Sequence, residues 1–579
     1  MFYTVIFWTL LLFGVSAGLH FETLSTVYLP FTYTPTPQYE LDKDAAEQMS
    51  YDSKNHILYS VGYTNIHVID VHNLTQPVVL HHSSYPNVDA TDVEVCGDFV
   101  YVAYDNKTTR EHGYIDVYKV YNKTTGTLDL VHKIIVGDIP DMVHPTSDCK
   151  KLVVAIEAEP YIDDINNKLI DNAGGVIILT FTGDGQYTLT NLTFDKFNSR
   201  FEELSQSGVR WIYRGNNNTF ANDIEPEYIT FNTDESKAYI CLQENNAIAV
   251  VNMETNDIEE ILGLGYKHWT EFNSDVSDKD GGVAMKTWPI YGMYQPDSIK
   301  FYRHHGVDYI ILANEGDSKD YPPYFSEENR VDDLTLSNMF EPNVTIRNEL
   351  MEREKLGRLT VTNVNGKNET YGEYDRLYSF GGRSFTIRRV DNMEIVYDSG
   401  DELERMTSLL QHELFNNDVK PSKTVIDTMD SRSDNKGPET ESITMGHVNG
   451  VTLLMIGNER PGTIAVYSID EKLPTPQPVF ETMIHGISKT NDTWENLYSN
   501  ADVSMLDPED IRFVPGPESP NKKPLLLVSG SVSGTVTILQ VHVDVTEDEG
   551  QFFNHSNAVT SNILFIVTML ILTIFNTSY

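Results

Sequence analysis

The chain has 579 residues, of which 40% are hydrophobic and 11% aromatic, enough to bury a large core and to exclude disorder throughout. It carries 42 Lys and Arg against 85 Asp and Glu, a formal net charge of −43 at pH 7. A field of this sign repels phosphate backbones and concentrates cations, which argues against nucleic acid as a partner.

Residues 1–17 have the layout of a secretory signal peptide. The segment is almost wholly apolar up to Val15, and small residues follow where a signal peptidase cuts. It lacks a basic residue before the apolar run, so an N-terminal membrane anchor is the alternative. N-x-S/T sequons agree with export and predict glycans at Asn73, Asn106, Asn122, Asn191, Asn217, Asn343, Asn368, Asn491 and Asn554.

A dense apolar strand followed by an alternating strand recurs along residues 34–543. The alternating strand reads NIHVIDV, GYIDVYKV, GGVIILTF, NAIAVVNM, RSFTIRRV, GTIAVYSI and GTVTILQV. β-Branched residues at alternate positions predict strands with one face buried. Seven such units predict seven small antiparallel sheets stacked around an axis, an all-β, seven-bladed β-propeller. A pair of β-sandwiches is the alternative.

The three cysteines, Cys96, Cys149 and Cys241, are too few for a disulfide scaffold and lie at no zinc-ligand spacing. Cys96 and Cys149 each precede the dense strand of neighbouring units. Because we expect equivalent positions of adjacent blades to be too far apart for the short Cα separation of a disulfide, the sequence predicts no bridge between them.

Three aspartates, Asp275, Asp278 and Asp280, precede two glycines in a loop that resembles a calcium loop. An EF-hand would need acidic residues where Val276 and Thr287 stand, so that motif is excluded. Another type of calcium-binding turn and a plain solvated loop both remain open.

Two helices are predicted beside the repeats. The longest insertion lies in the fifth unit, between residues 316 and 380, and includes a predicted helix over 348–356 that ends at Gly357. After the fifth unit, Asp401 and Glu404 make a D-x-x-E capping arrangement. We expect the apolar stripe of this second helix to dock onto the propeller, and its members are Leu403, Met406, Leu410 and Leu414.

The C-terminus has the layout of a GPI-anchor signal. The apolar run over 563–575 has 13 residues, whereas a spanning helix needs about 20. No basic residue follows the run, and small residues around Ser556 precede it. We predict a linker over 544–562 with Ser556 as the attachment candidate, and a removed tail over 563–579; a short transmembrane helix is the alternative. The expected location is the outer face of the plasma membrane, through the lipid anchor, or the extracellular space.

Acidic residues recur just before the first strand of a unit and at the end of the second. In a propeller these positions face one another around the channel mouth, where a ring of carboxylates suits Ca²⁺, or Mg²⁺ if the site is small. The alternative is that the charges cap strands and pair with Arg383, Arg460 and Lys436. The recurring positions are Asp141, Glu225, Glu227, Asp297, Glu439, Glu441 and Glu509 before the first strand, and Glu157, Glu244, Glu315 and Glu459 after the second.

Six of the acidic residues around the mouth are the candidate metal ligands. The sequence has no G-x-S-x-G elbow, H-E-x-x-H helix, P-loop or G-x-G-x-x-G turn, so it assigns no catalytic residue and leaves enzymatic activity open. The metal-ligand candidates are Glu227, Asp297, Glu315, Asp317, Glu439 and Glu459.

Several sequence blocks together resemble the choice-of-anchor I domain family, in one order from about Thr34 to Val543. Among them are EPEYITFNTDESKAYICLQENNAIAVVN, DVSDKDGG, WPIYGMYQPDSI, ANEGDSKDY, RSDNKGPETE and GNERPGTIAVYSI. The animal branch of this family comprises mesenchyme-specific cell-surface glycoproteins of biomineralising cells. The resemblance implies a propeller-like domain, GPI or other anchoring and a role in forming calcified skeleton, and some bacterial members carry an alkaline-phosphatase label. The seventh unit departs from the pattern, because SGSVSGT lacks an acidic residue after its strand.

The leading hypothesis is a secreted, N-glycosylated, GPI-anchored acidic glycoprotein of the cell surface. It would bind Ca²⁺ or a mineral surface, contact the extracellular matrix and contribute to biomineralisation. One alternative is a metal-dependent phosphoester hydrolase with Arg383 or Arg460 as phosphate clamp. The other is a protein-binding adhesion propeller.

Overall fold

The computed structural model describes residues 18–543 except 86, 107–111, 164–166 and 184–185. The predicted signal peptide, the C-terminal linker with Asn554 and Ser556, and the apolar tail lie outside the described residues. Within the described part, no helix is both long enough and apolar enough to span a bilayer.

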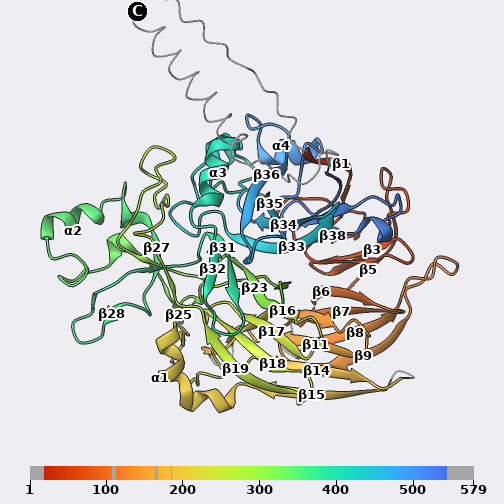
Figure 1. Cartoon of the computed structure of the whole chain (residues 1–579), viewed down its shortest axis with the longest axis horizontal. Helices are drawn as coiled ribbons and strands as arrows, with labels where there is room; N and C mark the ends of the chain where they lie inside the picture. Colours follow the sequence, from red (N-terminus) through yellow and green to blue (C-terminus); the bar gives the residue numbers. More distant parts are fainter. Residues whose placement is uncertain (1–17, 86, 107–111, 164–166, 184–185, 544–579) are drawn as a thin grey trace, which may run out of the picture.

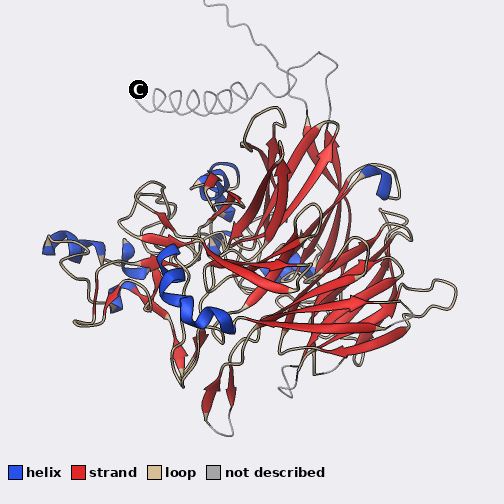
Figure 2. Ribbon diagram, turned by 60° about the horizontal axis from the view of Figure 1, so that its bottom comes forward, coloured by secondary structure: helices blue, strands red, loops and turns tan. Residues whose placement is uncertain are grey.

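Seven antiparallel sheets of four or five strands follow one another along the described chain, and in each of them the strands pair in series. Strands dominate the molecule, and its helices are short (Figure 2). The sheets are β2 (Met49–Asp52), β3 (Ile57–Gly62), β4 (Asn65–Asp70) and β5 (Val78–Ser84); β6 (Asp89–Cys96), β7 (Phe99–Asp105), β8 (Tyr114–Lys119) and β9 (Leu130–Ile135); β10 (Pro140–Pro145), β11 (Lys151–Ile156), β14 (Gly175–Phe181) and β15 (Tyr187–Thr193); β16 (Pro226–Phe231), β17 (Lys237–Leu242), β18 (Ala247–Asn252) and β19 (Asp257–Gly263); β22 (Ile299–His304), β23 (Val307–Asn314), β31 (Ser384–Arg389) and β32 (Ile395–Asp398); β33 (Thr440–Val448), β34 (Val451–Asn458), β35 (Thr463–Ile469), β36 (Pro478–Ile487) and β37 (Val503–Ser504); and β38 (Asp510–Val514), β39 (Leu525–Gly530), β40 (Thr535–Val543) and β1 (Leu19–Tyr28).

The first strand of each sheet contacts the first strand of the next, from β2 through β6, β10, β16, β22 and β33 to β38. The circle closes where the Met49 backbone N–H donates to Asp510 Oδ2 over 3.2 Å. The N-terminal strand β1 pairs along β40, so both ends of the described chain complete the last sheet. Sheets arranged in this way form a β-propeller, which confirms the all-β propeller prediction and excludes the paired sandwiches.

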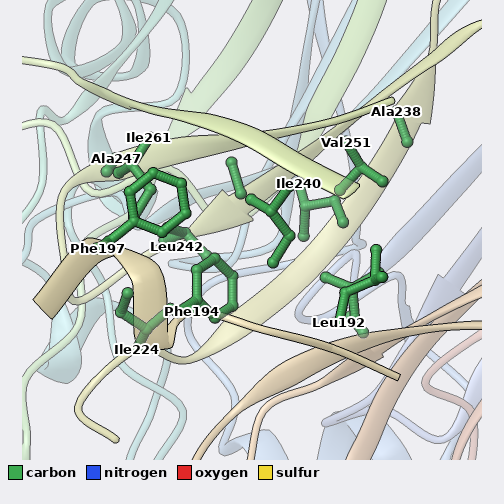
Figure 3. Packing of buried hydrophobic residues seen from close by; sticks show 14 of the residues in the cluster. Leu192, Phe194, Phe197, Ile224, Ala238, Ile240, Leu242, Ala247, Val251 and Ile261 are labelled. Atoms are coloured by element: carbon green, nitrogen blue, oxygen red, sulfur yellow. The ribbon is translucent and has the colours of Figure 1, made fainter. Parts of the chain in front are cut away.

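The sheets hold together because each buries apolar side chains against its neighbours. Between the third and fourth sheets, Val153 and Ile178 pack against Ile240, which is fully buried. Phe194 and Phe197, at the start of the short helical segment that follows β15, close this core (Figure 3). Dense apolar strands are therefore required wherever a sheet has protein on both faces.

Cys96 and Cys149 form a disulfide, with Cα atoms 5.6 Å apart. The prediction of no bridge is therefore wrong. Cys96 ends β6 and Cys149 lies in the turn between β10 and β11, so the two cysteines occupy matching hairpin turns of successive sheets. β10 contacts both β6 and β7, which brings these turns within disulfide distance. Cys241 is buried and free.

Replacing Cys96 and Cys149 together with serine should lower the free energy of unfolding by about 2–4 kcal/mol, since the bridge closes a long loop in the unfolded chain. The loop spans 53 residues. Urea unfolding of the wild type and the double variant, each with and without reductant, measures the effect. Reductant should bring the wild type to the midpoint of the variant and leave the variant unchanged; equal midpoints under oxidising conditions would contradict the prediction.

The insertion between β23 and β31 projects from one side of the propeller and carries helix α2 (Val344–Leu350; green in Figure 1). The predicted helix over 348–356 is therefore misplaced. Asn343 caps α2, its Oδ1 accepting from the Thr345 backbone N–H over 2.9 Å, and this cap fixes an earlier start. Gly357 instead lies in a short 3₁₀ turn, Leu356–Arg358.

The second predicted helix exists as α3 (Glu402–Leu410), but its capping arrangement is wrong. Asp401 makes no side-chain cap, and Glu404 is buried against Arg383. Leu403 and Met406 pack on the propeller core, as expected. Leu410 is 49% exposed and takes no part in the docking, whereas Leu414, just after the helix, packs in a second buried cluster that includes Ile487 and Val503 of the sixth sheet.

Candidate cation-binding site

Five of the first strands are entered through a proline followed by an acidic residue; in one of them, β33, the pair is Pro438-Glu439, and Glu439 is ion-paired with Lys436. The pairing of β10 with β11 and of β16 with β17 shifts register at this point, which is the mark of a β-bulge. A bulge turns a side chain out of the regular alternation. The acidic residues of the other four pairs line one cavity, so the repeat explains how separate sheets aim carboxylates at the channel; these pairs are Pro140-Asp141, Pro226-Glu227, Pro296-Asp297 and Pro508-Glu509.

The cavity at the channel mouth has a volume of about 220 Å³. No lysine or arginine is among the described residues that line it. Glu227 Oε2 and Asp297 Oδ2 are buried there without a hydrogen-bond partner, an arrangement that is unfavourable unless a ligand or a proton satisfies the oxygens. The acidic lining residues are Glu47, Asp92, Asp141, Glu157, Glu159, Glu227, Asp297 and Glu509.

Burial and mutual repulsion raise the carboxyl pKa values in this cavity. Burial, followed by the charge of Glu244, raises the pKa of Glu227 well above its usual range. Burial, followed by the charge of Glu315, does the same to the pKa of Asp297. Protons therefore stay on such groups at pH values where exposed carboxylates are ionised, unless a cation replaces them.

A second part of the acidic mouth is neutralised from within by Lys436. Its Nζ lies 2.6 Å from Glu315 Oε1, and 3.5 Å from carboxylate oxygens of Asp317 and Glu439. Lys436 comes from the segment between the fifth and sixth sheets. Three of the predicted metal ligands are therefore ion-paired, as the pairing alternative proposed.

Arginines complete this neutralised part. Arg432 Nε donates to Glu439 Oε1 over 2.7 Å, and Arg460 forms an ion pair with Glu459. The pKa of Glu439 is held well below its usual range despite burial, because Lys436 and Arg432 stabilise the charged form. Of the six predicted ligands, only Glu227 and Asp297 have no ion pair among the described residues.

Lys319, from the insertion in the fifth sheet, neutralises a third part. Its fully buried Nζ lies 2.7 Å from Glu225 Oε1 and 3.5 Å from Asp223 Oδ1. Sequence reasoning missed this lysine, because its position in the ring depends on the path of a long insertion.

Arg383 is not part of the acidic mouth. It is buried, donates to Glu404 Oε1 over 2.9 Å, and donates to the backbone carbonyls of Ser433 and Asn435 over 2.7 Å each. The prediction that Arg383 neutralises the ring or clamps a phosphate is therefore wrong, because its donors are already bonded inside the protein. Arg460 is likewise engaged with Glu459.

The candidate calcium loop is only partly assembled. Asp275 and Asp280 lie with Asp430 in a group whose ligand atoms are all within 4.8 Å of one another. Asp278 instead accepts from Arg358 Nε over 2.9 Å. Burial raises the pKa of Asp275 and of Asp430, each to about 7. Asp430 is distant in sequence, so no local motif could have named it.

Two further groups have ligand atoms within 4.8 Å of one another: Glu315, Glu439 and Glu459, and Glu441, Asp507 and Glu509. Of these six residues, the sequence-based reasoning had not singled out Asp507. The D-P-E run at 507–509 is the available signal, because it repeats the E-P-E run at 225–227. Ser531 stands where the acidic residue of the seventh unit is missing, and its hydroxyl donates to Asp507 Oδ2.

The sequon asparagines within the described residues are all accessible. Asn106 and Asn368 are half-buried and the other six are exposed. All eight described sequons are thus compatible with glycosylation; they are Asn73, Asn106, Asn122, Asn191, Asn217, Asn343, Asn368 and Asn491.

Fold and site together define a β-propeller with an acidic channel mouth and an accessible set of sequons. The choice-of-anchor I domain model matches residues 47–472, which is most of the chain. The chain belongs to the choice-of-anchor I family.

Two animal proteins are similar in sequence. Gigasin-3a of Magallana gigas is 38% identical over 186 residues, which are 32% of this chain and 64% of gigasin-3a. The mesenchyme-specific cell surface glycoprotein of Strongylocentrotus purpuratus is 30% identical over 371 residues, 57% of this chain and 47% of the relative. The matched part thus spans less than two thirds of either relative.

Solved structures give weaker likenesses. Kuenenia stuttgartiensis hydrazine synthase is 11% identical with a TM-score of 0.43, covering 87% of this chain and 98% of that one. The Cps50 (Swd1) β-propeller domain of Myceliophteria thermophila is 7% identical with a TM-score of 0.38, covering 91% and 100%. The propeller fold is defined by the strand pairing itself.

Proposed function

We propose that this protein is a glycoprotein of the extracellular surface that binds Ca²⁺ at the channel mouth and contributes to mineral deposition. The observation that carries the proposal is the cavity lined by eight acidic residues, in which Glu227 and Asp297 each leave a buried oxygen without a partner. The similarity to a mesenchyme-specific cell surface glycoprotein supports the surface location. Attachment through a GPI anchor at Ser556 is part of the proposal.

The chemistry of the lining favours a hard cation. Among the described residues that line the cavity, the charged ones are all carboxylates and Met142 alone carries sulfur. Calcium takes six to eight oxygen ligands in flexible geometry, whereas Mg²⁺ needs a compact octahedral set and loses its water reluctantly. A wide cavity with carboxylates from several sheets therefore favours Ca²⁺ over Mg²⁺.

Calorimetric titration of the glycosylated ectodomain with CaCl₂ should show saturable binding, with weaker or no heat from MgCl₂ at the same concentrations. Repeating the titration at raised NaCl separates a defined site from the diffuse attraction of a −43 chain, because salt screens diffuse attraction. A calcium signal that vanishes with moderate salt, or no signal at all, would contradict the proposal.

A further inference from the structure

We infer that Glu441, Asp507 and Glu509 form the primary divalent-cation site of the channel mouth, and that the neighbouring group of Glu315, Glu439 and Glu459 binds no cation. This inference rests on the proposed function and names the ligands that would perform it.

The first support is that this carboxylate trio has unsatisfied buried oxygens. Glu441 is 7% exposed and Asp507 is 8% exposed. Among the residues that the structure describes, Glu441 Oε2 and Asp507 Oδ1 find no hydrogen-bond partner. Within the described ranges, no lysine or arginine nitrogen lies within 4.0 Å of a carboxylate oxygen of the three residues. The charge of Arg460 acts on Asp507, but without an ion pair within 4.0 Å, so the three carboxylates converge as a set of hard ligands with no basic group bonded to them among the described residues.

The second support is that the backbone holds the ligands in place. Asp507 has φ of 58°, so the chain bends sharply between Asp507 and Glu509. The Ser531 hydroxyl donates to Asp507 Oδ2, and the Ser442 hydroxyl donates to the Pro508 carbonyl. The bend is thus fixed on one side to the β39–β40 turn and on the other to β33. A cation entering the trio would meet ligands that need little rearrangement.

The third support is the contrast with the adjacent group. Glu315, Glu439 and Glu459 converge equally closely, but the Lys436 ammonium lies 2.6 Å from Glu315 and Arg460 pairs with Glu459. These side chains already supply the positive charge that a metal ion would bring. A divalent cation there would have to displace or oppose them, which like-charge repulsion disfavours.

Glu509 connects the trio with the cavity, because it belongs to both. The ligand oxygens of Glu441, Asp507 and Glu509 all lie within 4.8 Å of one another, so the three negative charges repel one another when the groups are ionised. Mutual repulsion of this kind is what a bound cation relieves.

Two matched double variants test the assignment by calorimetry with CaCl₂ alone. The first variant combines Glu441→Gln with Asp507→Asn, and the second combines Glu315→Gln with Glu459→Gln. Each variant removes two negative charges and keeps the shapes of the side chains. The first should weaken calcium affinity at least tenfold, and the second should change it less than threefold. In chelator, the first variant should melt at the same temperature as the wild type or higher, since repulsion falls, whereas the second should melt lower, since Lys436 and Arg460 each lose one ionic partner.

The outcomes separate the two levels of the proposal. If the wild type itself binds no calcium, the proposed function fails. If the wild type binds and Glu441→Gln with Asp507→Asn retains full affinity, the trio assignment is overturned while the proposed function stands. If that double variant does not fold, the single variant Glu509→Gln replaces it, and the measurement is the rise in melting temperature on adding CaCl₂. A rise much smaller than that of the wild type supports the assignment. A rise equal to that of the wild type overturns it.

Discussion

Replacing Lys319 with methionine should lower the free energy of unfolding by about 3–5 kcal/mol at neutral pH, the range observed when one partner of a buried ion pair is removed. The Lys319 side chain is 0% exposed, and so is that of Asp223; the side chain of Glu225 is 1% exposed. Methionine fills a similar volume but leaves the two carboxylates without a counter-charge. Their repulsion and desolvation then oppose folding.

The loss should shrink as the pH falls, because protonation removes the unpaired charges. Burial raises the pKa of Glu225 and of Asp223, so both take up protons more readily than exposed carboxyls. Urea unfolding at pH 8 and pH 5.5 measures the difference. The control is Lys150→Met, which removes an exposed partner of Asp148. It should change the free energy of unfolding at neither pH. A Lys319→Met variant as stable as the wild type at pH 8 would show that the lysine does not neutralise the acidic mouth.

The strands could be predicted because their signal is local. The run NAIAVVNM contains β18, Ala247–Asn252, and RSFTIRRV contains β31, Ser384–Arg389. In both, alternate β-branched or apolar residues match the period of a strand that packs on a neighbour. The position of the acidic residues at the channel mouth follows from the same repeat, since equivalent positions of successive sheets superpose around the axis.

The division of the acidic mouth could be predicted only in part. Lys436 and Arg460 are partners that the pairing alternative names, and both form such ion pairs. Lys319 comes from an insertion, and no periodicity encodes where an insertion returns to the propeller.

The disulfide prediction is wrong because it took the spacing between adjacent sheets as the distance between their equivalent turns. The turns approach each other more closely, and the Cα atoms of Cys96 and Cys149 are 5.6 Å apart. Asp507 could have been predicted, because it precedes Pro508 as Glu225, one of the recurring positions, precedes Pro226.

In chelator, the melting temperature of the protein should fall as the pH rises from about 7 to about 8.5, and calcium should reverse the fall. Burial holds the pKa values of Glu227, Glu441 and Glu509 well above their usual range. Glu244, whose pKa burial raises to about 7, has lost most of its contribution at the start of this range. The folded state therefore binds more protons than the unfolded chain. Its stability is complete below the unfolded carboxyl pKa and is lost as the pH rises through the folded values.

The pH range is chosen so that the histidines and Glu439 do not mask the effect. Burial lowers the pKa of His144 to about 4 and that of His67 to about 3, so both histidines add stability as the pH rises towards about 6.5, and add no more above it. Glu439, whose folded pKa is lowered, affects stability only under acid conditions. Above pH 7 the raised carboxyls lower the stability, whereas Lys267 and Lys300, whose pKa values burial lowers, oppose the fall, so the difference between the wild type and a variant of the carboxyls isolates their effect.

Bound calcium stabilises the folded state by an amount that grows with the logarithm of the ratio of the calcium concentration to the dissociation constant. Protons compete with calcium for the same carboxylate oxygens. The gap between melting temperatures with CaCl₂ and with chelator should therefore widen from pH 7 to pH 8.5. Glu441→Gln with Asp507→Asn should flatten the decline in chelator and narrow the gap, because two of the repelling groups no longer ionise. Thermal melts of wild type and variant across this range provide the measurement. A wild-type melting temperature that declines in chelator no more steeply than that of the variant would mean that these buried carboxylates carry no excess protons, and the cation would then have no proton to displace.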